Sequence, residues 1–262
     1  MLLLSVNQPV KKAVIQVFIM KILVISDVHS NIWALNAILS FEKDVDILCC
    51  AGDLLDYGTT PVEVIDCLKS IKISNYIVKG NHDLHVIRTW KNGSYKLVTS
   101  QEYKWVHHNC WRINEDHVEY LMQLPETIYF EADGYGYLIK HQYKESYETI
   151  NNCHQFNKFW SEHAPGKDSS YKKKRIIFGH THQQSIHILR DDMVLLNPGS
   201  TSYRRPGDPD KEAQYMVIKD GSVELKSIPY ERGALLAEAL VYKRNNSMMA
   251  SEIADFEFFF GD

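Results

Sequence analysis

The sequence predicts a single-domain α/β protein, and two features carry that prediction. Apolar runs that break at Gly52-Asp53 and again at Gly80-Asn81 are typical of buried parallel strands, and a helical pattern lies between them. The 262 residues are 45% hydrophobic and 24% charged, with no repeat, low-complexity segment or convincing linker. This is the composition of an ordinary globular chain, so one domain is expected rather than two.

The helix between the two runs has a recognisable start. Thr60, Pro61 and Glu63 stand where an N-cap hydroxyl, a first-turn proline and a capping-box glutamate are expected. The segment is therefore predicted to be a βαβ unit. In open α/β sheets ligands bind beyond the carboxyl ends of the strands, and both apolar runs meet polar side chains at that point.

The chain begins with an extension, residues 1–19, that we predict not to belong to the fold. It lacks the basic segment and the cleavage site of a signal peptide, and the apolar stretch 14–25 is shorter than the ~20 residues of a membrane span. The domain is predicted to cover residues 20–262, and a translation start at Met20 is compatible with this division. Its first strand, 21–26, leads into a helix capped by Ser30 or Asn31.

Beyond the βαβ unit, residues 84–124 are predicted to be helical and to stop at Pro125. Residues 142–174 are predicted to be an irregular insertion and residues 231–262 a helical tail. The aromatic run 256–260 is expected to cover the core, with a contact in a homo-oligomer as the alternative. The expected strands are 127–131, 135–140, 176–178, 185–189, 193–196, 214–219 and 222–228.

Charge and cysteine content exclude several kinds of partner and environment. A net charge of −4 gives no broad surface for nucleic acid or anionic membranes, and the basic run Lys172–Arg175 is predicted to be a charged lead-in to a strand. The five cysteines are odd in number, form no CxxC motif and include the adjacent pair Cys49-Cys50 in a buried strand. This pattern predicts free thiols in a reducing cytoplasm.

Side chains of metal-binding types follow five of the predicted strands. Because parallel strands end along one edge, we expect these side chains to converge. Converging carboxylates and imidazoles repel and lose solvation, and a pair of divalent ions relieves both costs. Mixed carboxylate, imidazole and amide ligands suit Mn²⁺, Fe²⁺, Zn²⁺, Co²⁺ or Ni²⁺ better than Mg²⁺ or Ca²⁺, and Mn²⁺ is the expected metal. The residues are Asp27, His29, Asp53, Asn81, His82, His141, His180 and His182.

These blocks, in this order, resemble the calcineurin-like metallophosphoesterase superfamily. The resemblance covers about residues 20–205 and implies a four-layer α/β/β/α sandwich with a dimetal site at the strand ends. Tyr57 stands where the protein-phosphatase branch has arginine, which argues against that branch, and Asn197-Pro198-Gly199-Ser200 resembles the small bacterial and archaeal phosphodiesterase branch. The blocks that carry the resemblance are Asp27-x-His29, Gly52-Asp53-x-x-Asp56, Gly80-Asn81-His82-Asp83, His141 and Gly179-His180-x-His182.

The resemblance also implies a set of metal ligands. The ligands of one metal would be Asp27, His29 and His182. Those of the other would be Asn81, His141 and His180, with Asp53 bridging the two. The family usually has glycine after the histidine at position 141, where this chain has Gln142. The alternatives to His141 are therefore His107, His108, His154 and His163.

The reaction implied is hydrolysis of a phosphate ester by in-line attack of a metal-bridging hydroxide. His82 matches the catalytic histidine and Asp56 the carboxylate that orients it, while Asp83 is interpreted as a cap rather than as a reacting group. A protonated histidine suits the leaving alkoxide, which needs a proton. Arg204 and Arg205 are candidates for pairing with a substrate phosphate, and a solvated surface pair is the alternative.

We expect a small phosphate-ester substrate, and three functions remain open. The first is hydrolysis of a phosphodiester or a nucleotide-like phosphate ester. The second is a phosphomonoesterase acting on phosphoprotein or sugar phosphate. The third is a non-catalytic protein-binding scaffold of the same fold, which the filled ligand positions and the presence of His82 argue against.

Overall fold

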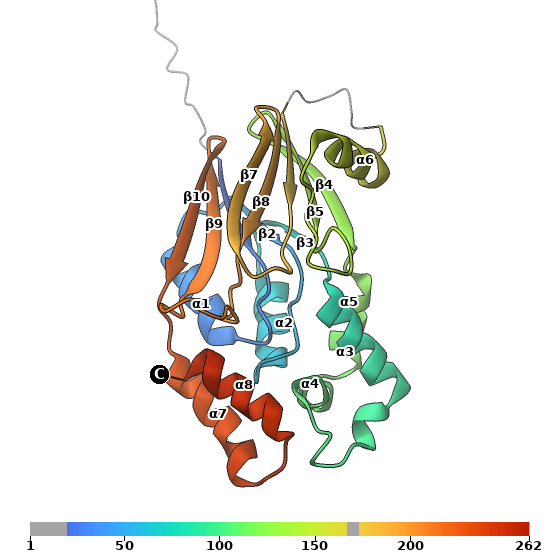
Figure 1. Ribbon diagram of the computed structural model, residues 1–262, viewed down its shortest axis with the longest axis vertical. Helices are drawn as coiled ribbons and strands as arrows, with labels where there is room; N and C mark the ends of the chain where they lie inside the picture. Colours follow the sequence, from blue (N-terminus) through green and yellow to red (C-terminus); the bar gives the residue numbers. More distant parts are fainter. Residues whose placement is uncertain (1–19, 167–172, 262) are drawn as a thin grey trace, which may run out of the picture.

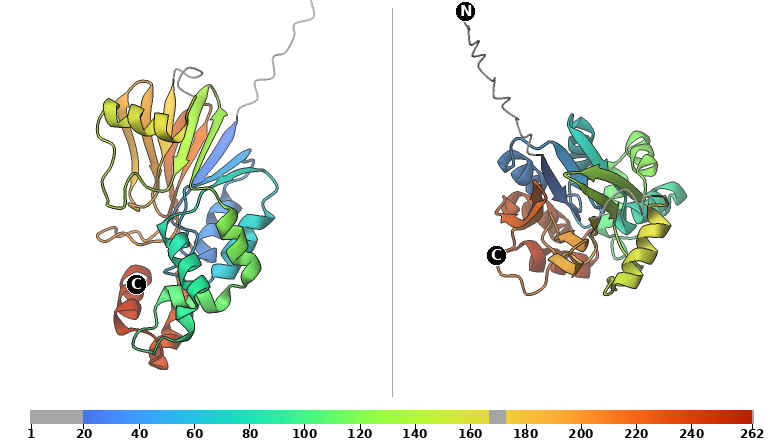
Figure 2. Two further views of the ribbon diagram at one scale, coloured as in Figure 1. Left: turned by 90° about the vertical axis from the view of Figure 1, so that its right-hand side faces the viewer. Right: turned by 90° about the horizontal axis from the view of Figure 1, so that it is seen from above.

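The computed structural model describes residues 20–166 and 173–261. The predicted extension, residues 1–19, and Lys172 of the basic run lie outside the described residues. Within them the chain forms two five-stranded sheets that lie face to face, with helices on both outer sides (Figures 1 and 2). The predicted four-layer α/β/β/α sandwich is confirmed.

The first sheet has the strand order β10-β9-β1-β2-β3 and supplies three of the five strand ends that carry the predicted site residues. Strands β1, β2 and β3 run parallel, and β9 joins β1 in the antiparallel direction. Helix α2 (Pro61–Ser70) connects β2 to β3, so the predicted βαβ unit is present. The strands are β1 (Lys21–Ile25), β2 (Ile47–Cys50), β3 (Ser74–Ile77), β9 (Ala213–Lys219) and β10 (Ser222–Ile228).

The second sheet has the order β4-β5-β6-β8-β7. Strands β5, β6 and β8 are parallel, and hairpins add β4 and β7 at the two edges. The β4–β5 turn places Asp133 and Gly134 at φ of 50° and 75°, the conformation of a two-residue hairpin loop. The strands are β4 (Thr127–Ala132), β5 (Tyr135–Lys140), β6 (Lys174–Ile177), β7 (Gln184–Arg190) and β8 (Met193–Pro198).

Three hydrophobic cores hold the layers together. The core between the sheets joins side chains such as Ile22 and Cys49 of the first sheet to Tyr137 and Ile177 of the second. A second core lies between the first sheet and the helices on its outer face. These helices are α1 (Ile32–Phe41), α2, α3 (Asn81–Asn92), α4 (Trp105–Arg112) and α5 (Glu115–Gln123), with the short 3₁₀ turn η1 (Ser94–Lys96) after α3.

The third core lies between the second sheet and a helix that was not predicted. Residues 142–174 were predicted to be irregular, and this prediction is wrong for part of the segment. They contain helix α6 (Cys153–His163), which covers the outer face of the second sheet (Figure 2). Phe156, Phe159 and Trp160 are buried against Leu138 and Ile176 of that sheet. Their spacing of three and four residues is that of one helix face, a signal that the polar residues around them obscured.

The start of helix α2 corrects a second prediction. Thr60 stands at the N-cap, but its hydroxyl makes no cap hydrogen bond. Instead it donates to the Ser30 carbonyl (2.7 Å) and accepts from the Ile32 amide (3.0 Å), which ties the β1–α1 loop to this helix. Helix α1 behaves as expected, since Asn31 accepts from the Ala34 amide.

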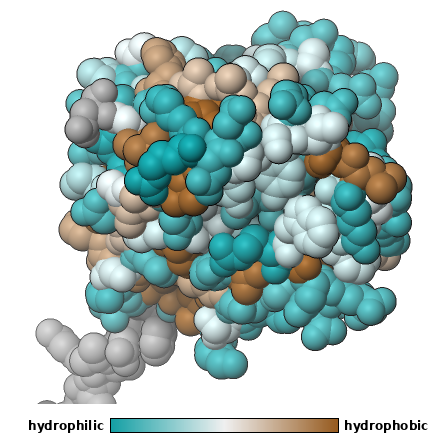
Figure 3. Space-filling model, turned by 90° about the horizontal axis from the view of Figure 1, so that it is seen from below, coloured by the Kyte–Doolittle hydropathy of each residue, from teal (hydrophilic) through white to brown (hydrophobic). Residues whose placement is uncertain are grey.

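The tail is helical, as predicted, and forms α7 (Arg232–Arg244) and α8 (Ala250–Phe260) beneath the lower ends of the strands (Figure 1). Phe256 and Phe260 are buried against Trp105 and Leu235, so the aromatic run does cover a core. On the face viewed from below in Figure 3, hydrophobic side chains lie in separate patches among hydrophilic ones.

Two further expectations concern the whole chain. All five cysteines are free, as predicted. Among the described helices, none combines the length and the apolar character that crossing a membrane requires.

Candidate metal centre

The candidate site lies where the carboxyl ends of strands from both sheets meet. The loops after β1, β2 and β3 come from the first sheet, and those after β5 and β6 from the second. The loops are bound directly to one another: the Asp27 amide donates to the Gly52 carbonyl (2.9 Å) and the Gly179 amide to the His141 carbonyl (2.9 Å). The predicted residues therefore converge from two stacked sheets.

The backbone at these loops is held in an uncommon conformation. Non-glycine residues with positive φ are infrequent, and clusters of them are found at functional sites. Five of the predicted ligand residues have positive φ: Asp27, His29, Asp53, His180 and His182, at 53°, 45°, 54°, 66° and 56°. Aspartate and histidine tolerate this region better than branched residues do.

Close backbone approach requires glycine at two of the strand ends. A Cβ at Gly80 would lie 2.1 Å from Asp53 Oδ1, and one at Gly179 would lie 1.9 Å from Ser26 Oγ and 2.7 Å from Asp27 Oδ2. Any larger residue would displace a carboxylate of the site. The glycines of these two motifs are therefore needed for packing at the site.

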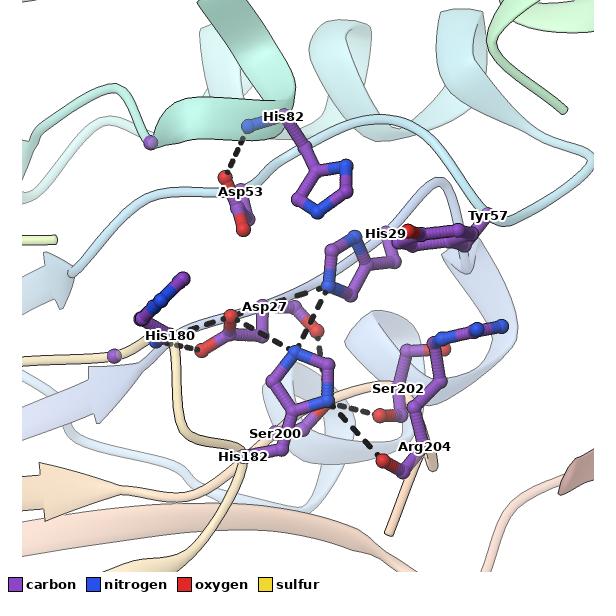
Figure 4. Close-up of polar contacts among 12 residues, drawn as sticks. Asp27, His29, Asp53, Tyr57, His82, His180, His182, Ser200, Ser202 and Arg204 are labelled. Atoms are coloured by element: carbon purple, nitrogen blue, oxygen red, sulfur yellow. Dashed lines mark hydrogen bonds and ion pairs between the residues drawn. The ribbon is translucent and has the colours of Figure 1, made fainter. Parts of the chain in front are cut away.

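The first cluster consists of Asp27, His29 and His182 (Figure 4). Asp27 Oδ1 lies 3.2 Å from His182 Nε2 and 3.9 Å from His29 Nε2. The two Nε2 atoms face each other at 3.1 Å. Asp27 and His29 are fully buried.

The second cluster contains Asp53, His141 and His180. Asp53 Oδ2 lies 3.0 Å from His141 Nε2. Asn81, the first residue of α3, has its side-chain oxygen buried without a hydrogen-bond partner among the described residues, and the same holds for the Nε2 atom of His180. Buried polar atoms are normally paired, so these two atoms point to a group that accepts their lone pairs.

Three of the four imidazoles in these clusters are anchored by the nitrogen that faces away from the cluster. An Nδ1–H that donates to a backbone carbonyl leaves the Nε2 lone pair available, and metal-binding histidines are usually held in this way. The Nδ1–oxygen distances are 3.2 Å for His29 to Leu55, 2.7 Å for His141 to Ala51 and 3.3 Å for His182 to Arg204.

The electrostatics of the clusters also fit bound cations. Burial and the nearby His182 lower the pKa of His29 to about 3, so this imidazole is neutral. Burial lowers the pKa of His141, but the Asp53 carboxylate outweighs that effect and raises it to about 9. In the absence of a cation, a protonated His141 neutralises the negative charge of the Asp53 carboxylate. A divalent ion would take that role and release the proton.

The predicted pair of Asp56 and His82 is formed. His82 Nδ1 lies 2.9 Å from Asp56 Oδ2. Burial lowers the pKa of His82, but the bond to Asp56 and the charges of the nearby carboxylates outweigh it, so the net shift is upward. The His82 side chain points into the space beside His29, and its backbone amide donates to Asp53 (Figure 4).

Asp83 and Asn109 organise the loops around this pair. Asp83 is fully buried and accepts from the amides of Gly80, Leu54 and Leu55 at 2.9–3.0 Å, so it is a cap, as interpreted. Asn109 of α4 was not predicted. Its side chain accepts from the Asp56 amide (3.0 Å) and donates to the Gly58 carbonyl (2.9 Å), and no local motif marks it in the sequence.

The two arginines after β8 differ. Arg205 is buried, and its guanidinium is bonded to Asp208, to the Ser200 carbonyl (3.1 Å) and to the Glu212 carbonyl (2.7 Å). The prediction that Arg205 binds substrate is therefore wrong, because its donors hold the loop together.

Arg204 is placed differently. Its guanidinium lies 3.9 Å from the ring centroid of Tyr57 and 4.7 Å from that of Phe259. The guanidinium makes no hydrogen bond or ion pair with the described residues, and it lines the cavity at the site. Its donors are therefore available to an anion.

The four histidines considered in place of His141 lie elsewhere. His108 is bonded through Nδ1 to the Tyr242 hydroxyl (2.6 Å) and through Nε2 to the Thr59 carbonyl (2.9 Å). His107, His154 and His163, like His108, belong to neither cluster, whereas His141 does. On α3, His85 was not predicted, and its Nδ1 lies 3.5 Å from Asp56 Oδ2.

A cavity of about 470 Å³ opens beside the clusters. Asp53, His82, His180 and His182 form its polar side. Its other walls include Arg204 and three aromatic residues from separate segments, which are Tyr57, Tyr147 and Phe259. Sequence reasoning missed the aromatic residues, because each is distant in the chain from the ligand motifs.

Comparisons with known proteins agree with this geometry. A family model described as the calcineurin-like phosphoesterase superfamily domain matches residues 20–220. An uncharacterized protein of Methanocaldococcus jannaschii is 26% identical over 230 residues, which cover 80% of this chain and 88% of that protein. The symmetrical bis(5'-nucleosyl)-tetraphosphatase of Pseudomonas putida strain F1 is 43% identical over 54 residues, or 21% of this chain and 19% of that enzyme.

Solved structures share the fold. A metallophosphoesterase from Sphaerobacter thermophilus superposes with a TM-score of 0.65 at 22% identity, over 93% of this chain and 100% of that one. A hypothetical protein from Pyrococcus horikoshii OT3 superposes with a TM-score of 0.68 at 13% identity, over 93% of this chain and 99% of that one. At these identities the likeness concerns the fold alone.

Proposed function

The chain belongs to the calcineurin-like phosphoesterase superfamily and is a phosphate-ester hydrolase, and we propose that it is a dimetal enzyme acting on phosphodiesters or nucleotide-like phosphate esters. The observation that carries the dimetal proposal is the anchoring of three imidazoles by Nδ1, which leaves their Nε2 atoms in two clusters with Asp27 and Asp53.

Residues of both clusters have the chemistry of divalent-metal ligands. We propose that Asp27, His29 and His182 hold one ion and that Asn81, His141 and His180 hold the other, with Asp53 shared. When bound, two such ions would supply positive charge that polarises the phosphate, and they would lower the pKa of bound water so that hydroxide is available at neutral pH. Imidazole-rich ligands favour Mn²⁺, Fe²⁺, Zn²⁺, Co²⁺ or Ni²⁺ over Mg²⁺ or Ca²⁺, and Mn²⁺ remains our expectation.

His82 is proposed to donate a proton to the leaving oxygen. Its Nδ1 is engaged with Asp56 at 2.9 Å, which fixes the ring and favours the imidazolium. The Nε2–H then remains for the substrate. Arg204 is proposed to pair with a phosphate oxygen, because its guanidinium is held in place by two rings and has free donors.

The walls of the cavity support a substrate with a flat organic group. Tyr57, Tyr147 and Phe259 present aromatic surface next to the clusters, and such surface suits a nucleoside base or another aromatic substituent. The short stretch of similarity to a symmetrical bis(5'-nucleosyl)-tetraphosphatase also makes dinucleoside polyphosphates worth testing. A phosphomonoesterase acting on sugar phosphates would not need these aromatic rings, because its substrates carry no flat aromatic group.

The test is a hydrolysis screen of the purified protein with added Mn²⁺. The substrates are bis-aryl phosphodiesters, aryl phosphomonoesters, cyclic nucleotides and dinucleoside polyphosphates. We expect the diester or nucleotide substrates to have the highest kcat/KM. A preference for simple monoesters over all of them would favour the phosphomonoesterase, and hydrolysis of none would contradict the proposed activity.

A further inference from the structure

A second cavity opens beside the second cluster. It has a volume of about 650 Å³, within the range of small-molecule sites. Asn81 and His141, two of the proposed ligands, form part of its wall, so it borders the place where the reacting phosphate would bind. The first cavity, which Arg204 lines, borders the clusters on another side, where its wall includes His82, His180 and His182.

The lining of the second cavity is rich in cations. It includes four basic side chains, Lys79, Arg88, Lys140 and Lys144, against the two carboxylates Glu126 and Glu145. Lys144 is paired with Glu148, but the other three form no ion pair with a described residue. Because the chain as a whole has a net charge of −4, this is a local concentration of positive charge.

The hydrogen bonds of Lys79 and Arg88 leave the charge of these two side chains uncompensated. Lys79 Nζ donates to the Met122 carbonyl at 3.0 Å, and Arg88 Nε donates to the Leu84 carbonyl at 3.2 Å. Both acceptors are neutral. Charge of one sign in a concave site raises the local concentration of oppositely charged ligands.

We propose that this cavity binds a second anionic group of the substrate, so that the substrate is a phosphorylated compound with a further phosphate next to the scissile one. The class includes nucleoside polyphosphates and other phosphoanhydrides. This inference rests on the proposed function, because it takes the reacting phosphate to lie at the two clusters. A substituent of that phosphate on the Asn81 and His141 side would enter among the cations.

The chemistry of such a substrate requires no further reactant. Water adds to the scissile phosphorus, the bond to the leaving oxygen on the His82 side breaks, and that oxygen departs with the electron pair and takes up a proton, while the bond to the second phosphate stays intact. The cations would neutralise charge on the phosphate that remains in the cavity. A neutral substituent in the same place would gain nothing from them.

The experiment compares orthophosphate with pyrophosphate, titrated calorimetrically into the full chain, both with Mn²⁺ and after treatment with a chelator. We expect pyrophosphate to bind the Mn²⁺-loaded protein at least about tenfold more tightly, the ratio that one charge-assisted hydrogen bond provides. Arg88→Gln should weaken pyrophosphate binding about threefold to tenfold and change orthophosphate binding less than twofold. Arg88→Gln combined with Lys140→Gln should have the larger effect, because Lys140 also lines the cavity and forms no ion pair with a described residue.

The matched control is Lys91→Gln, one helical turn after Arg88 on α3 and also exposed, but outside the cavity lining. It should bind both anions as the unmodified protein does, and metal chelation by pyrophosphate is the same for every variant. Equal affinity for the two anions, or pyrophosphate binding that is indifferent to Arg88, would overturn the inference. If the unmodified protein showed no phosphoesterase activity in the hydrolysis screen, that result would count against the proposed function. The titrations would still decide whether the cavity binds a second phosphate.

Discussion

Asn81 and His82 are adjacent at the start of α3, yet their side chains have different surroundings. The Asn81 oxygen is buried without a partner near the second cluster, whereas the His82 ring is bonded to Asp56. Consecutive residues at the first turn of a helix point in different directions, so one can hold a metal while the other faces the substrate. This division of roles leads to two predictions at the scale of single residues.

The first prediction concerns His82→Ala. The variant should keep both metals and lose roughly 10²–10⁴-fold in rate on alkyl or nucleoside esters, because general acids contribute about that factor. Its loss on p-nitrophenyl esters should be far smaller, since p-nitrophenolate leaves without a proton. Rate measurements on the two substrate types, with metal analysis of the variant, test this.

Equal losses on both substrate types would mean that His82 positions the phosphate or the attacking water instead. Loss of metal from the variant would make His82 a ligand. Asp56→Asn serves as a companion variant: it should show the same dependence on the leaving group with a smaller effect, because it removes the charge that favours the imidazolium and leaves the ring in place.

The second prediction concerns Asp53→Asn. If the carboxylate of Asp53 is shared by both ions, removing its charge weakens both sites at once. The purified variant should contain well under two equivalents of metal and show no measurable turnover. Asp208→Asn, whose carboxylate accepts from Arg205, Gln214 and the Asp210 amide and belongs to neither cluster, should keep its metal. Two full equivalents of metal in Asp53→Asn would exclude a bridging role.

At the scale of elements, the sequence supported predictions wherever the signal is local. Three of the five strand ends are marked by glycine beside a metal-binding residue, and the structure brings all eight of the predicted side chains to one region. Helix α6 was missed because its three buried aromatics lie among polar residues. The role of Thr60 was misjudged because its hydroxyl is used by another loop, a tertiary contact that no local pattern reveals.

Asn109 illustrates the same limit and leads to the third prediction. It is fully buried on α4, and its amide bonds to the Asp56 amide, the Gly58 carbonyl and the Trp105 carbonyl. Asn109→Ala removes these buried side-chain hydrogen bonds and leaves the Asp56 amide and the Gly58 carbonyl without this partner, so we expect the free energy of unfolding to fall by about 2–4 kcal/mol. Urea denaturation measures this.

The comparison for Asn109→Ala is Asn75→Ala. Asn75 is exposed and its side chain donates one hydrogen bond, to the nearby Ile73 carbonyl, so its replacement should change stability by less than about 0.5 kcal/mol. Similar stability of the two variants would show that the loops around Asp56 do not depend on α4.

At the scale of the whole molecule, the two sheets form a complete sandwich from Met20 onward. The Met20 carbonyl accepts from the Asp220 amide at 3.4 Å, and β1 is paired on both sides from Lys21 or Ile22. The fourth prediction is therefore that a chain starting at Met20 keeps its melting temperature and its turnover within experimental error. Thermal unfolding of both chains measures this, and a drop of several degrees would show that residues before Met20 contribute to the core.

The fifth prediction concerns Glu42, which joins helix α1 to three strands of the first sheet. Its side chain contacts Tyr215 at 2.9 Å and the ammonium groups of Lys226 and Lys21 at 2.5 and 2.8 Å. Burial raises the pKa of Glu42, but these hydrogen bonds and charges outweigh it and lower the pKa to about 2. A carboxyl with a pKa lowered in the folded state stabilises the fold above its unfolded pKa, and that stabilisation is lost as the pH falls toward 2.

The effect can be isolated by comparing the unmodified protein with Glu42→Gln, both freed of metal so that protonation of the metal ligands affects each alike. Between pH 5 and pH 2 the free energy of unfolding of the unmodified protein should fall by about 1–3 kcal/mol more than that of the variant. The lower end allows for screening at the partly exposed lysines. Denaturation at several pH values gives both curves, and parallel curves over this range would mean that Glu42 is no better paired in the folded chain than in the unfolded one.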